Sequence, residues 1–254
     1  RAAWGELAPP DVRALTAAIS ACEKAAVWET ALELLHEAGP GSERSAATFG
    51  AAVSAFQKGA KWELALAALD LMRTGRVAHD AITYSACMSA CIAGLQWARA
   101  LLLFDQLRGL HCVEPDRIAY NAAMQACAGG GLWERALQLF ASTAVPTIVS
   151  FNLVLDAVYR QPALARHIWE LGAARGVYHG FEQWHGSSGT LDLHRLSEGA
   201  SVTAALWWLE VRVPAREGQV THLYIVTGWG KSRLPHPRGG ITDPILKALP
   251  EGCG

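Results

Sequence analysis

Hydrophobic and small residues recur along the first two thirds of the chain with a period of about 35 residues. The recurring positions are a tryptophan (Trp28, Trp62, Trp97, Trp133), an alanine three residues later (Ala31, Ala65, Ala100, Ala136) and an aromatic residue (Phe49, Tyr84, Tyr120, Phe151). Several columns that share one period are the signature of a repeat protein. We therefore divide residues 12–176 into about five repeats, 12–45, 46–80, 81–116, 117–147 and 148–176.

Each repeat has the pattern of two helices. In the repeat 81–116, the segment ITYSACMSACIA predicts a first helix, Gly94 a break, and WARALLLFDQL a second helix. A single hairpin of this kind cannot bury its own apolar face, so neighbouring hairpins are expected to stack. The sequence therefore predicts a mostly α fold, a right-handed α-solenoid of helix-hairpin repeats with a concave groove. Pro162 is expected to open the second helix of the last repeat.

The helical period stops after the repeats. Residues 177–188 are interpreted as a linker, and residues 189–254 as a small α/β domain. Its expected elements are a strand at 189–194, a helix at 197–211 with Ser197 as its N-cap, a second strand at 222–228 and a helix at 241–249. Strands that alternate with helices in this order predict a parallel sheet.

Charge and cysteine content limit the functional classes. The net charge is −1, which argues against a protein that holds nucleic acid mainly by counterion release. The six cysteines include no C-x-x-C pair, and Cys22, Phe56, Cys91 and Cys127 occupy one column of the repeat. A phenylalanine in a cysteine column indicates packing, so we predict neither disulfides nor a metal site here. The apolar run 81–104 contains Ser85, Ser89, Gln96 and Arg99, and no membrane span is expected.

Helix-hairpin repeats of this length occur in tetratricopeptide and pentatricopeptide proteins, which bind peptides and RNA, respectively. The segments at 82–116 and 118–140, with an aromatic-plus-polar start and a Pro-Asp ending in the first, resemble the pentatricopeptide motif. The resemblance covers most of residues 12–176. It implies a monomeric array that binds single-stranded RNA and reads one base per repeat.

The resemblance also implies which residues read the bases. In that family they are the polar residue after the first aromatic residue of a repeat and the last residue of the repeat. The corresponding pairs here are Thr16 with Ser45, Gly50 with Asp80, Ser85 with Asp116, and Asn121 with Thr147, and Asn152 begins a fifth pair. Ser85 and Asp116 together suit guanine, because both accept hydrogen bonds, whereas Asn121 and Asn152 suit pyrimidine edges. The alternative is that these residues only begin helices, where Ser, Thr, Asn and Asp are favoured.

Two segments of the C-terminal domain resemble the Smr (small MutS-related) family. LDLHRLS at 191–197 resembles its LDLH motif, and TGWGKSR at 227–233 resembles its T-G-x-G loop, although Ser232 stands where that family often has a histidine. Several Smr domains are nicking endonucleases. The resemblance implies nucleic-acid contacts by Thr227, Gly228, Gly230 and Lys231, since glycine backbone N–H groups and a lysine suit phosphate.

The residue chemistry at 191–194 is compatible with phosphodiester hydrolysis. Alternation along a strand places Asp192 and His194 on one side. Asp192 could orient a water or hold a divalent ion such as Mg²⁺, and His194 could transfer a proton. The alternative is that the Asp192 carboxylate caps a helix and that His194 is a structural histidine with its hydrogen bonds satisfied.

The sequence therefore predicts a protein that binds RNA and acts in organellar RNA processing, in a chloroplast or mitochondrion, with a domain whose candidate activity is that of an endoribonuclease. A non-catalytic RNA- or protein-binding adaptor is the main alternative, and a tetratricopeptide-like scaffold is a more distant one. The chain begins with Arg1, so residues 1–11 are interpreted as the end of a fragment, with further repeats and a targeting peptide upstream. It stops at Gly254, so the α/β domain is expected to be incomplete.

Overall fold

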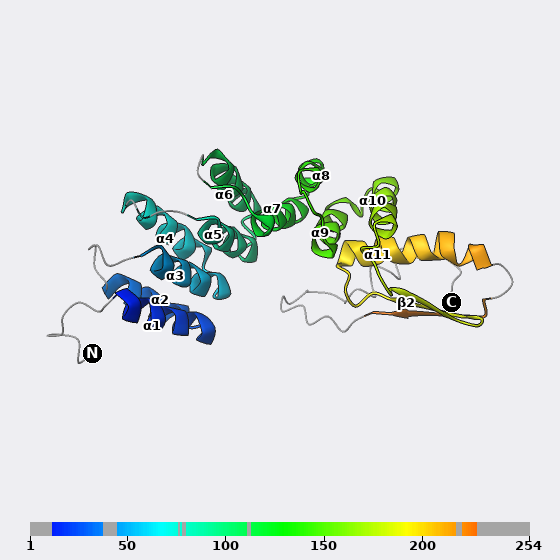
Figure 1. Ribbon diagram of the computed structural model, residues 1–254, viewed down its shortest axis with the longest axis horizontal. Helices are drawn as coiled ribbons and strands as arrows, with labels where there is room; N and C mark the ends of the chain where they lie inside the picture. Colours follow the sequence, from blue (N-terminus) through cyan, green and yellow to red (C-terminus); the bar gives the residue numbers. More distant parts are fainter. Residues whose placement is uncertain are drawn as a thin grey trace. The chain divides into compact units, whose positions relative to one another are not determined.

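The computed structural model describes residues 12–37, 45–75, 77, 80–110, 113–216 and 220–227 (Figure 1). The chain forms two compact units, Arg1–Gly130 and Gly131–Gly254. Ten helices lie within residues 12–176 of the described chain, and no strand lies within its described residues between 46 and 142. Both observations confirm the expected helical repeats. None of the described helices is both long enough and apolar enough to cross a membrane.

The first unit consists of three complete helix hairpins and the first helix of a fourth. Its helices are α1 (Val12–Ala25), α2 (Trp28–Glu37), α3 (Ala46–Lys58), α4 (Trp62–Thr74), α5 (Ala81–Ala93), α6 (Trp97–Gly109) and α7 (Arg117–Gly129). The first helix of each repeat packs against the first helix of the next, as in α1 with α3, α3 with α5 and α5 with α7. The second helix of each repeat also packs against the following first helix. This stacking buries the apolar faces that single hairpins leave open.

The start of each first helix is defined by a local signal. Ser45, Asp80 and Asp116 are the N-caps of α3, α5 and α7, and each side chain accepts a hydrogen bond from a backbone N–H in the first turn. Between the two helices of each of the first four hairpins, one residue has a positive φ, namely Ala26, Ala60, Leu95 or Gly131.

The cysteine column packs inside the repeats. Phe56, Cys91 and Cys127 are buried, and the four described cysteines (Cys22, Cys87, Cys91, Cys127) are free thiols. Burial raises the pKa of the Cys91 thiol to about 11, so this thiol stays neutral and unreactive. The expected packing role of the column is confirmed for these positions.

The second unit combines the end of the repeats with a small sheet. Its elements are α8 (Trp133–Ala141), α9 (Ile148–Val158), α10 (Pro162–Ala174), β1 (Glu182–His185), β2 (Ser188–Asp192), α11 (Glu198–Trp207) and β3 (His222–Val226). A π-helical turn, Trp208–Arg212, extends α11, and a short 3-10 turn follows at Pro214–Arg216. Pro162 occupies the first turn of α10, as expected.

The sheet has the order β1-β2-β3, and α11 covers one of its faces (Figure 1). β2 and β3 are parallel, with Asp192 opposite Val226, and β1 is antiparallel to β2. On the helix side, the Trp184 ring packs against Trp208, and the Glu182 carboxylate accepts a hydrogen bond from Trp208 Nε1 and pairs with Arg212. The sheet is therefore mixed, whereas the sequence predicted only parallel strands.

The expected linker 177–188 was wrong in part, because it contains β1 and the turn to β2. Gly186 and Ser187 connect the two strands, and Gly186 has a φ of 58°. A two-residue turn with a positive φ favours glycine, so the segment WHGSSG carried a hairpin signal. The boundary between the compact units also differs from the expected one, since it falls at residue 130 rather than near residue 177.

The boundary differs because α11 packs on the last repeat. α11 contacts α9 and α10, as the first helix of a further repeat would. Gly199, near the start of α11, allows this close approach, because a Cβ there would lie 2.7 Å from the Leu155 carbonyl oxygen in α9. The α/β elements and the fifth repeat therefore share one core.

Ser197 occupies the N-cap position of α11, but its side chain makes no capping hydrogen bond. Its hydroxyl instead donates to the Asn152 carbonyl oxygen at 3.2 Å. The cap is supplied by α9, where Asp156 Oδ1 accepts a hydrogen bond from Gly199 N at 2.8 Å. Burial raises the pKa of Asp156, and the hydrogen bond from Gly199 acts in the opposite direction.

Candidate nucleic-acid interface

The predicted base-reading residues at the ends of the repeats all begin helices. Asp80 Oδ1 accepts hydrogen bonds from Thr83 N at 2.8 Å and from Thr83 Oγ1 at 2.6 Å, and Asp116 Oδ1 accepts one from Ala119 N at 2.8 Å. Thr147 forms a capping box with Ser150 at the start of α9. A carboxylate has about four acceptor sites, so capping leaves Asp80 and Asp116 able to bind a base as well.

The polar residues near the start of the first helices lie in different environments. Thr16 Oγ1 lies 2.8 Å from Thr48 Oγ1, and it also donates to the Val12 carbonyl oxygen at 2.7 Å. Ser85 is only 4% exposed, and its hydroxyl has no hydrogen-bond partner among the described residues. Thr16 thus bonds to a threonine of the following repeat. In the repeat that follows Ser85, the residue equivalent to Thr48 is Ala119, which has no hydroxyl to bond to Ser85.

The last of these residues, Asn152, is engaged within the second unit. Its Nδ2 donates a hydrogen bond to the Arg195 carbonyl oxygen at 3.0 Å, and its own carbonyl accepts one from Ser197. The fifth repeat thus uses its expected base-reading side chain to hold the loop after β2. Asn121 is half-buried in α7.

The structure reveals a second column that the sequence analysis missed. Ile82, Ile118 and Val149 are large apolar residues that are 68%, 58% and 50% exposed. Each lies three residues before one of the predicted base-reading residues Ser85, Asn121 and Asn152. This spacing places the two side chains on one face of the helix. An exposed aliphatic side chain beside a polar one offers a base an apolar surface and a hydrogen-bonding edge. The signal in the sequence was a large apolar residue in the first turn of α5, α7 and α9, out of phase with the core.

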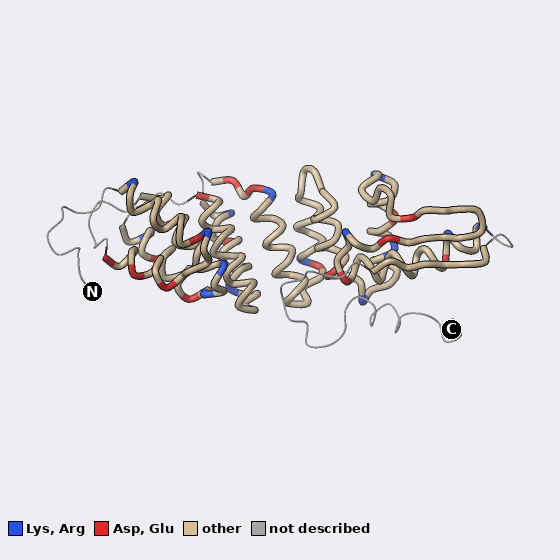
Figure 2. The backbone as a smooth tube through the Cα atoms, turned by 90° about the horizontal axis from the view of Figure 1, so that it is seen from below, with Lys and Arg blue, Asp and Glu red and all other residues tan. Residues whose placement is uncertain are grey.

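Charge does not define this interface. Figure 2 shows acidic and basic positions interspersed along the described helices of both units. Cation–π contacts occupy some of the basic side chains, such as Lys61 over the Trp28 ring and Arg99 over the Trp62 ring. Any recognition by the repeats would therefore depend on local contacts rather than on a basic surface.

The segments at 191–197 and 227–233 begin at neighbouring strand ends. Asp192 is the last residue of β2 and pairs with Val226, the last residue of β3, and Leu193 N donates to the Val226 carbonyl oxygen at 2.9 Å. Thr227 is half-buried directly after β3. The other predicted residues of the loop, Gly228, Gly230 and Lys231, and the expected helix 241–249 lie outside the described residues.

Asp192 and His194 are in direct contact. His194 Nδ1 lies 2.5 Å from Asp192 Oδ1, which also accepts a hydrogen bond from His194 N at 3.0 Å. The contact arises from a turn after β2, not from alternation along the strand as expected. The hydrogen bonds from the backbone and the ring of His194 lower the pKa of Asp192. An ionised carboxylate can only accept, so Nδ1 carries the proton and Nε2 of a neutral ring is left as an acceptor.

Both side chains of this pair are exposed at the carboxyl ends of parallel strands, where α/β sheets place their sites. The arrangement holds an imidazole in one tautomer with Nε2 able to take a proton. Among the described residues, no group of three or more His, Cys, Asp or Glu side chains could hold a metal ion. Asp192 could contribute one carboxylate ligand to a divalent ion.

Comparisons with known proteins agree with the repeat architecture. The profile of the PPR repeat family matches residues 118–142, which include α7 and α8. Among solved structures, the pentatricopeptide repeat protein PPR10 from maize matches 81% of this chain with a TM-score of 0.57 and 22% sequence identity. PPR10 in complex with an 18-nt psaJ RNA element matches 77% of this chain with a TM-score of 0.59 and 20% identity. No curated protein matches the sequence.

These matches show that the helical repeats have the fold of a pentatricopeptide repeat solenoid. The chain spans 28% of the length of the maize PPR10 structure.

Proposed function

We propose that this chain binds single-stranded RNA in a sequence-selective manner and acts in organellar RNA processing. The observation that carries the proposal is the pairing of two columns on the first helices, an exposed aliphatic residue and a polar residue three positions later. Ile118 with Asn121 is one example, within the segment that matches the PPR repeat profile. A solved structure with the same fold, PPR10, contains an 18-nt RNA element.

The chemistry of the columns explains how such a surface would bind RNA. Every base has an apolar face that can pack on an isoleucine or valine side chain, and this contact is independent of sequence. A neighbouring polar side chain, such as Asn121 or the N-cap Asp116, then reaches the Watson–Crick edge and distinguishes the bases, whereas Ser85 is buried. With four or five repeats, the site would be short and its affinity modest.

The proposal is tested by converting the fourth residue pair into the third. Asn121→Ser with Thr147→Asp is expected to shift the preferred base at one position towards guanine in a binding-selection experiment. Aspartate remains a good N-cap at residue 147, so folding should be retained. Asn152→Ser is the matched control, because Asn152 already bonds to Arg195, and it should leave every base preference unchanged. An identical selected sequence for all three proteins would refute base reading by these pairs.

A second function is proposed for the Asp192–His194 pair, which is the hydrolysis of a phosphodiester bond. His194 Nε2 would take a proton from a water whose oxygen forms a bond to phosphorus. The bond from phosphorus to the leaving ribose oxygen would break, and that oxygen would be protonated. Asp192 would hold the imidazole in the required tautomer, and a divalent ion such as Mg²⁺ bound with its help would neutralise charge on the phosphate. The alternative is an adaptor that binds RNA without cleaving it.

A further inference from the structure

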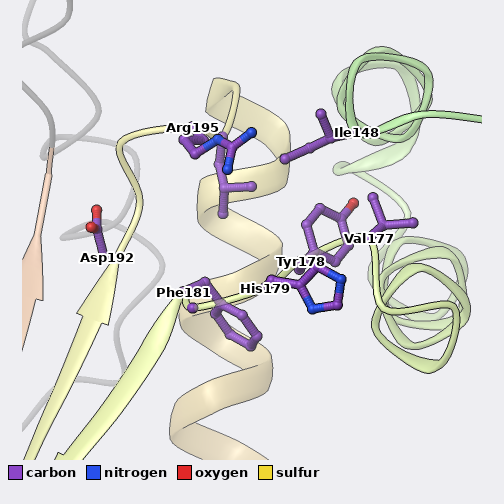
Figure 3. A pocket seen from close by; sticks show the side chains of 9 residues that line it. Ile148, Val177, Tyr178, His179, Phe181, Asp192 and Arg195 are labelled. Carbon is purple, nitrogen blue, oxygen red and sulfur yellow. The ribbon is translucent and has the colours of Figure 1, made fainter.

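A small cavity of about 50 Å³ lies in the second unit, and Asp192 is one of the residues that line it (Figure 3). The loop between α10 and β1 contributes Tyr178 and His179, the start of α9 contributes Ile148, and the loop after β2 contributes Arg195. Asp192, at the end of β2, lines the side towards the sheet, and its carboxylate points away from the other labelled side chains (Figure 3). The cavity is therefore formed by the last repeat and the α/β elements together, within one compact unit.

Tyr178 presents a buried hydroxyl without a partner in this cavity. The residue is 6% exposed, and its hydroxyl makes no hydrogen bond among the described residues. The ring stacks on Trp169 with 4.1 Å between centroids, and it lies over Gly172, where a Cβ would be 2.5 Å from Tyr178 Cε2. The ring is thus held in place. A buried hydroxyl without a partner destabilises the fold, so its retention in a cavity suggests a ligand that accepts its hydrogen bond.

Burial also raises the pKa of Tyr178, which keeps the phenol protonated as a donor. The ligand must therefore carry an acceptor.

Arg195 supplies a positive charge to the same cavity. Its carbonyl is bonded to Asn152 Nδ2 at 3.0 Å, which anchors the backbone, while its exposed guanidinium has no ion pair among the described residues. In Figure 3, the Tyr178 hydroxyl and the Arg195 guanidinium both point towards Ile148, the first residue of α9. The backbone N–H groups at a helix start favour anions. His179, also exposed, adds two ring nitrogens to the rim.

Asp192 is the one acidic residue that lines the cavity. Its Oδ1 is occupied by two hydrogen bonds from His194. The donors that remain available around the cavity are a phenol, a guanidinium and a helix N-terminus, and this set matches a phosphate group.

We propose that this cavity binds a phosphate group of single-stranded RNA, with Arg195 as its counter-ion and the Tyr178 hydroxyl as a hydrogen-bond donor. The site would hold the backbone of an RNA strand next to Asp192 and His194. The assignment of the phosphate to RNA rests on the RNA binding proposed above, whereas binding of phosphate as such does not.

The first experiment uses inorganic phosphate and the whole chain. Phosphate is expected to raise the melting temperature of the unchanged protein and of Arg160→Gln, a control that removes an exposed arginine at the other end of α9. The increase should disappear in Arg195→Gln. Tyr178→Phe should melt no lower than the unchanged protein without phosphate, because it removes an unpartnered hydroxyl, and yet it should respond less to phosphate. Equal responses from all four proteins would overturn the site.

The second experiment distinguishes RNA from free phosphate. A twelve-nucleotide RNA that the chain binds is titrated with and without a 5′-phosphate, and Arg195→Gln should weaken binding of both forms at least about tenfold relative to Arg160→Gln. A loss confined to the 5′-phosphorylated RNA would place a terminal phosphate in the cavity. Unchanged RNA affinity in Arg195→Gln would overturn the assignment to RNA. If the chain bound no RNA at all, the proposed function would fail, and the phosphate titration would still decide the site.

Discussion

The indole ring of Trp62 lies directly against the backbone of Gly94, so that a Cβ at Gly94 would stand 2.2 Å from Trp62 Cδ1. Trp62 begins the second helix of one repeat, and Gly94 ends the first helix of the next. The same relationship joins Trp28 to Gly59 and Trp97 to Gly129. The tryptophan and glycine columns of the sequence are therefore partners across successive repeats, and together they determine how closely the hairpins approach.

Gly94→Ala is expected to destabilise the first unit by about 1–3 kcal/mol, because the new methyl group must displace a packed indole ring. Chemical denaturation measures the change. Gly109→Ala is the matched control, since nothing lies within 4 Å of a Cβ at that position at the end of α6, and it should change stability little. Equal stability of the two variants would show that the tryptophan column does not pack as described.

Leu95→Gly is expected to stabilise the protein by about 0.5–1 kcal/mol. Leu95 has a φ of 59°, a conformation that is strained for a residue with a side chain, and the side chain is 68% exposed. Gly131 already occupies the corresponding position of the fourth repeat with a φ of 70°. Leu102→Gly, in the middle of α6 and 58% exposed, should instead destabilise by about 1 kcal/mol. Thermal and urea unfolding of both variants would check the opposite signs.

Asp156→Ala is expected to destabilise the second unit by about 1–2 kcal/mol, because it removes the cap of α11. Asp156→Asn should cost much less, since its Oδ1 can still accept from Gly199 N. The pKa of Asp156 is raised, so the folded state holds this proton more tightly than the unfolded chain does. The stabilisation that comes from binding this proton is therefore fully present below the ordinary aspartate pKa. It is lost as the pH rises through the raised pKa of the folded state. Unfolding measured from pH 3 to 7 should show a weaker pH dependence for Asp156→Asn.

Ile118→Ser is expected to weaken RNA binding several-fold without changing the preferred bases, because the aliphatic face contacts any base equally. Leu102→Ser, an exposed aliphatic residue on a second helix, is the control and should leave RNA affinity unchanged. Fluorescence anisotropy with a selected RNA measures both. A change in base preference caused by Ile118→Ser would contradict the division of roles between the two columns.

Asp192→Asn and His194→Ala are each expected to lower any RNA cleavage by about 10²–10⁴-fold, since the two side chains act as one unit. RNA affinity should change little, because base contacts are assigned to the repeats and the proposed phosphate contacts to Arg195 and Tyr178. Cleavage of a matched RNA is followed with and without Mg²⁺. Because the pKa of Asp192 is lowered, this carboxylate should stay ionised to a lower pH than an ordinary aspartate. Equal cleavage by all three proteins would remove the pair from catalysis, and no cleavage by the unchanged protein would favour the adaptor.

Much of the architecture followed from local patterns in the chain. Recurrent Trp, Ala and aromatic columns indicated ten helices, because a period near 35 residues with a break in the middle suits one hairpin per repeat. The strands β2 and β3 were expected for a similar reason, since short apolar runs at 189–194 and 222–228 alternate with a helix, although β2 ends earlier than expected, at Asp192. Caps such as Asp116 also lie where a polar residue precedes an apolar helix.

Tertiary packing decided what those residues do. Asn152 had the same local sequence context as Asn121, and only the packing of α11 on α9 turned its side chain to the Arg195 carbonyl. Ser197 looked like a cap, but Asp156, 43 residues away from Gly199, takes that role. The Tyr178 hydroxyl became a candidate ligand group because the stacking on Trp169 holds it in a cavity without a partner. Periodicity specifies which face of a helix is buried, whereas the partner of a buried polar atom depends on which distant segment packs there.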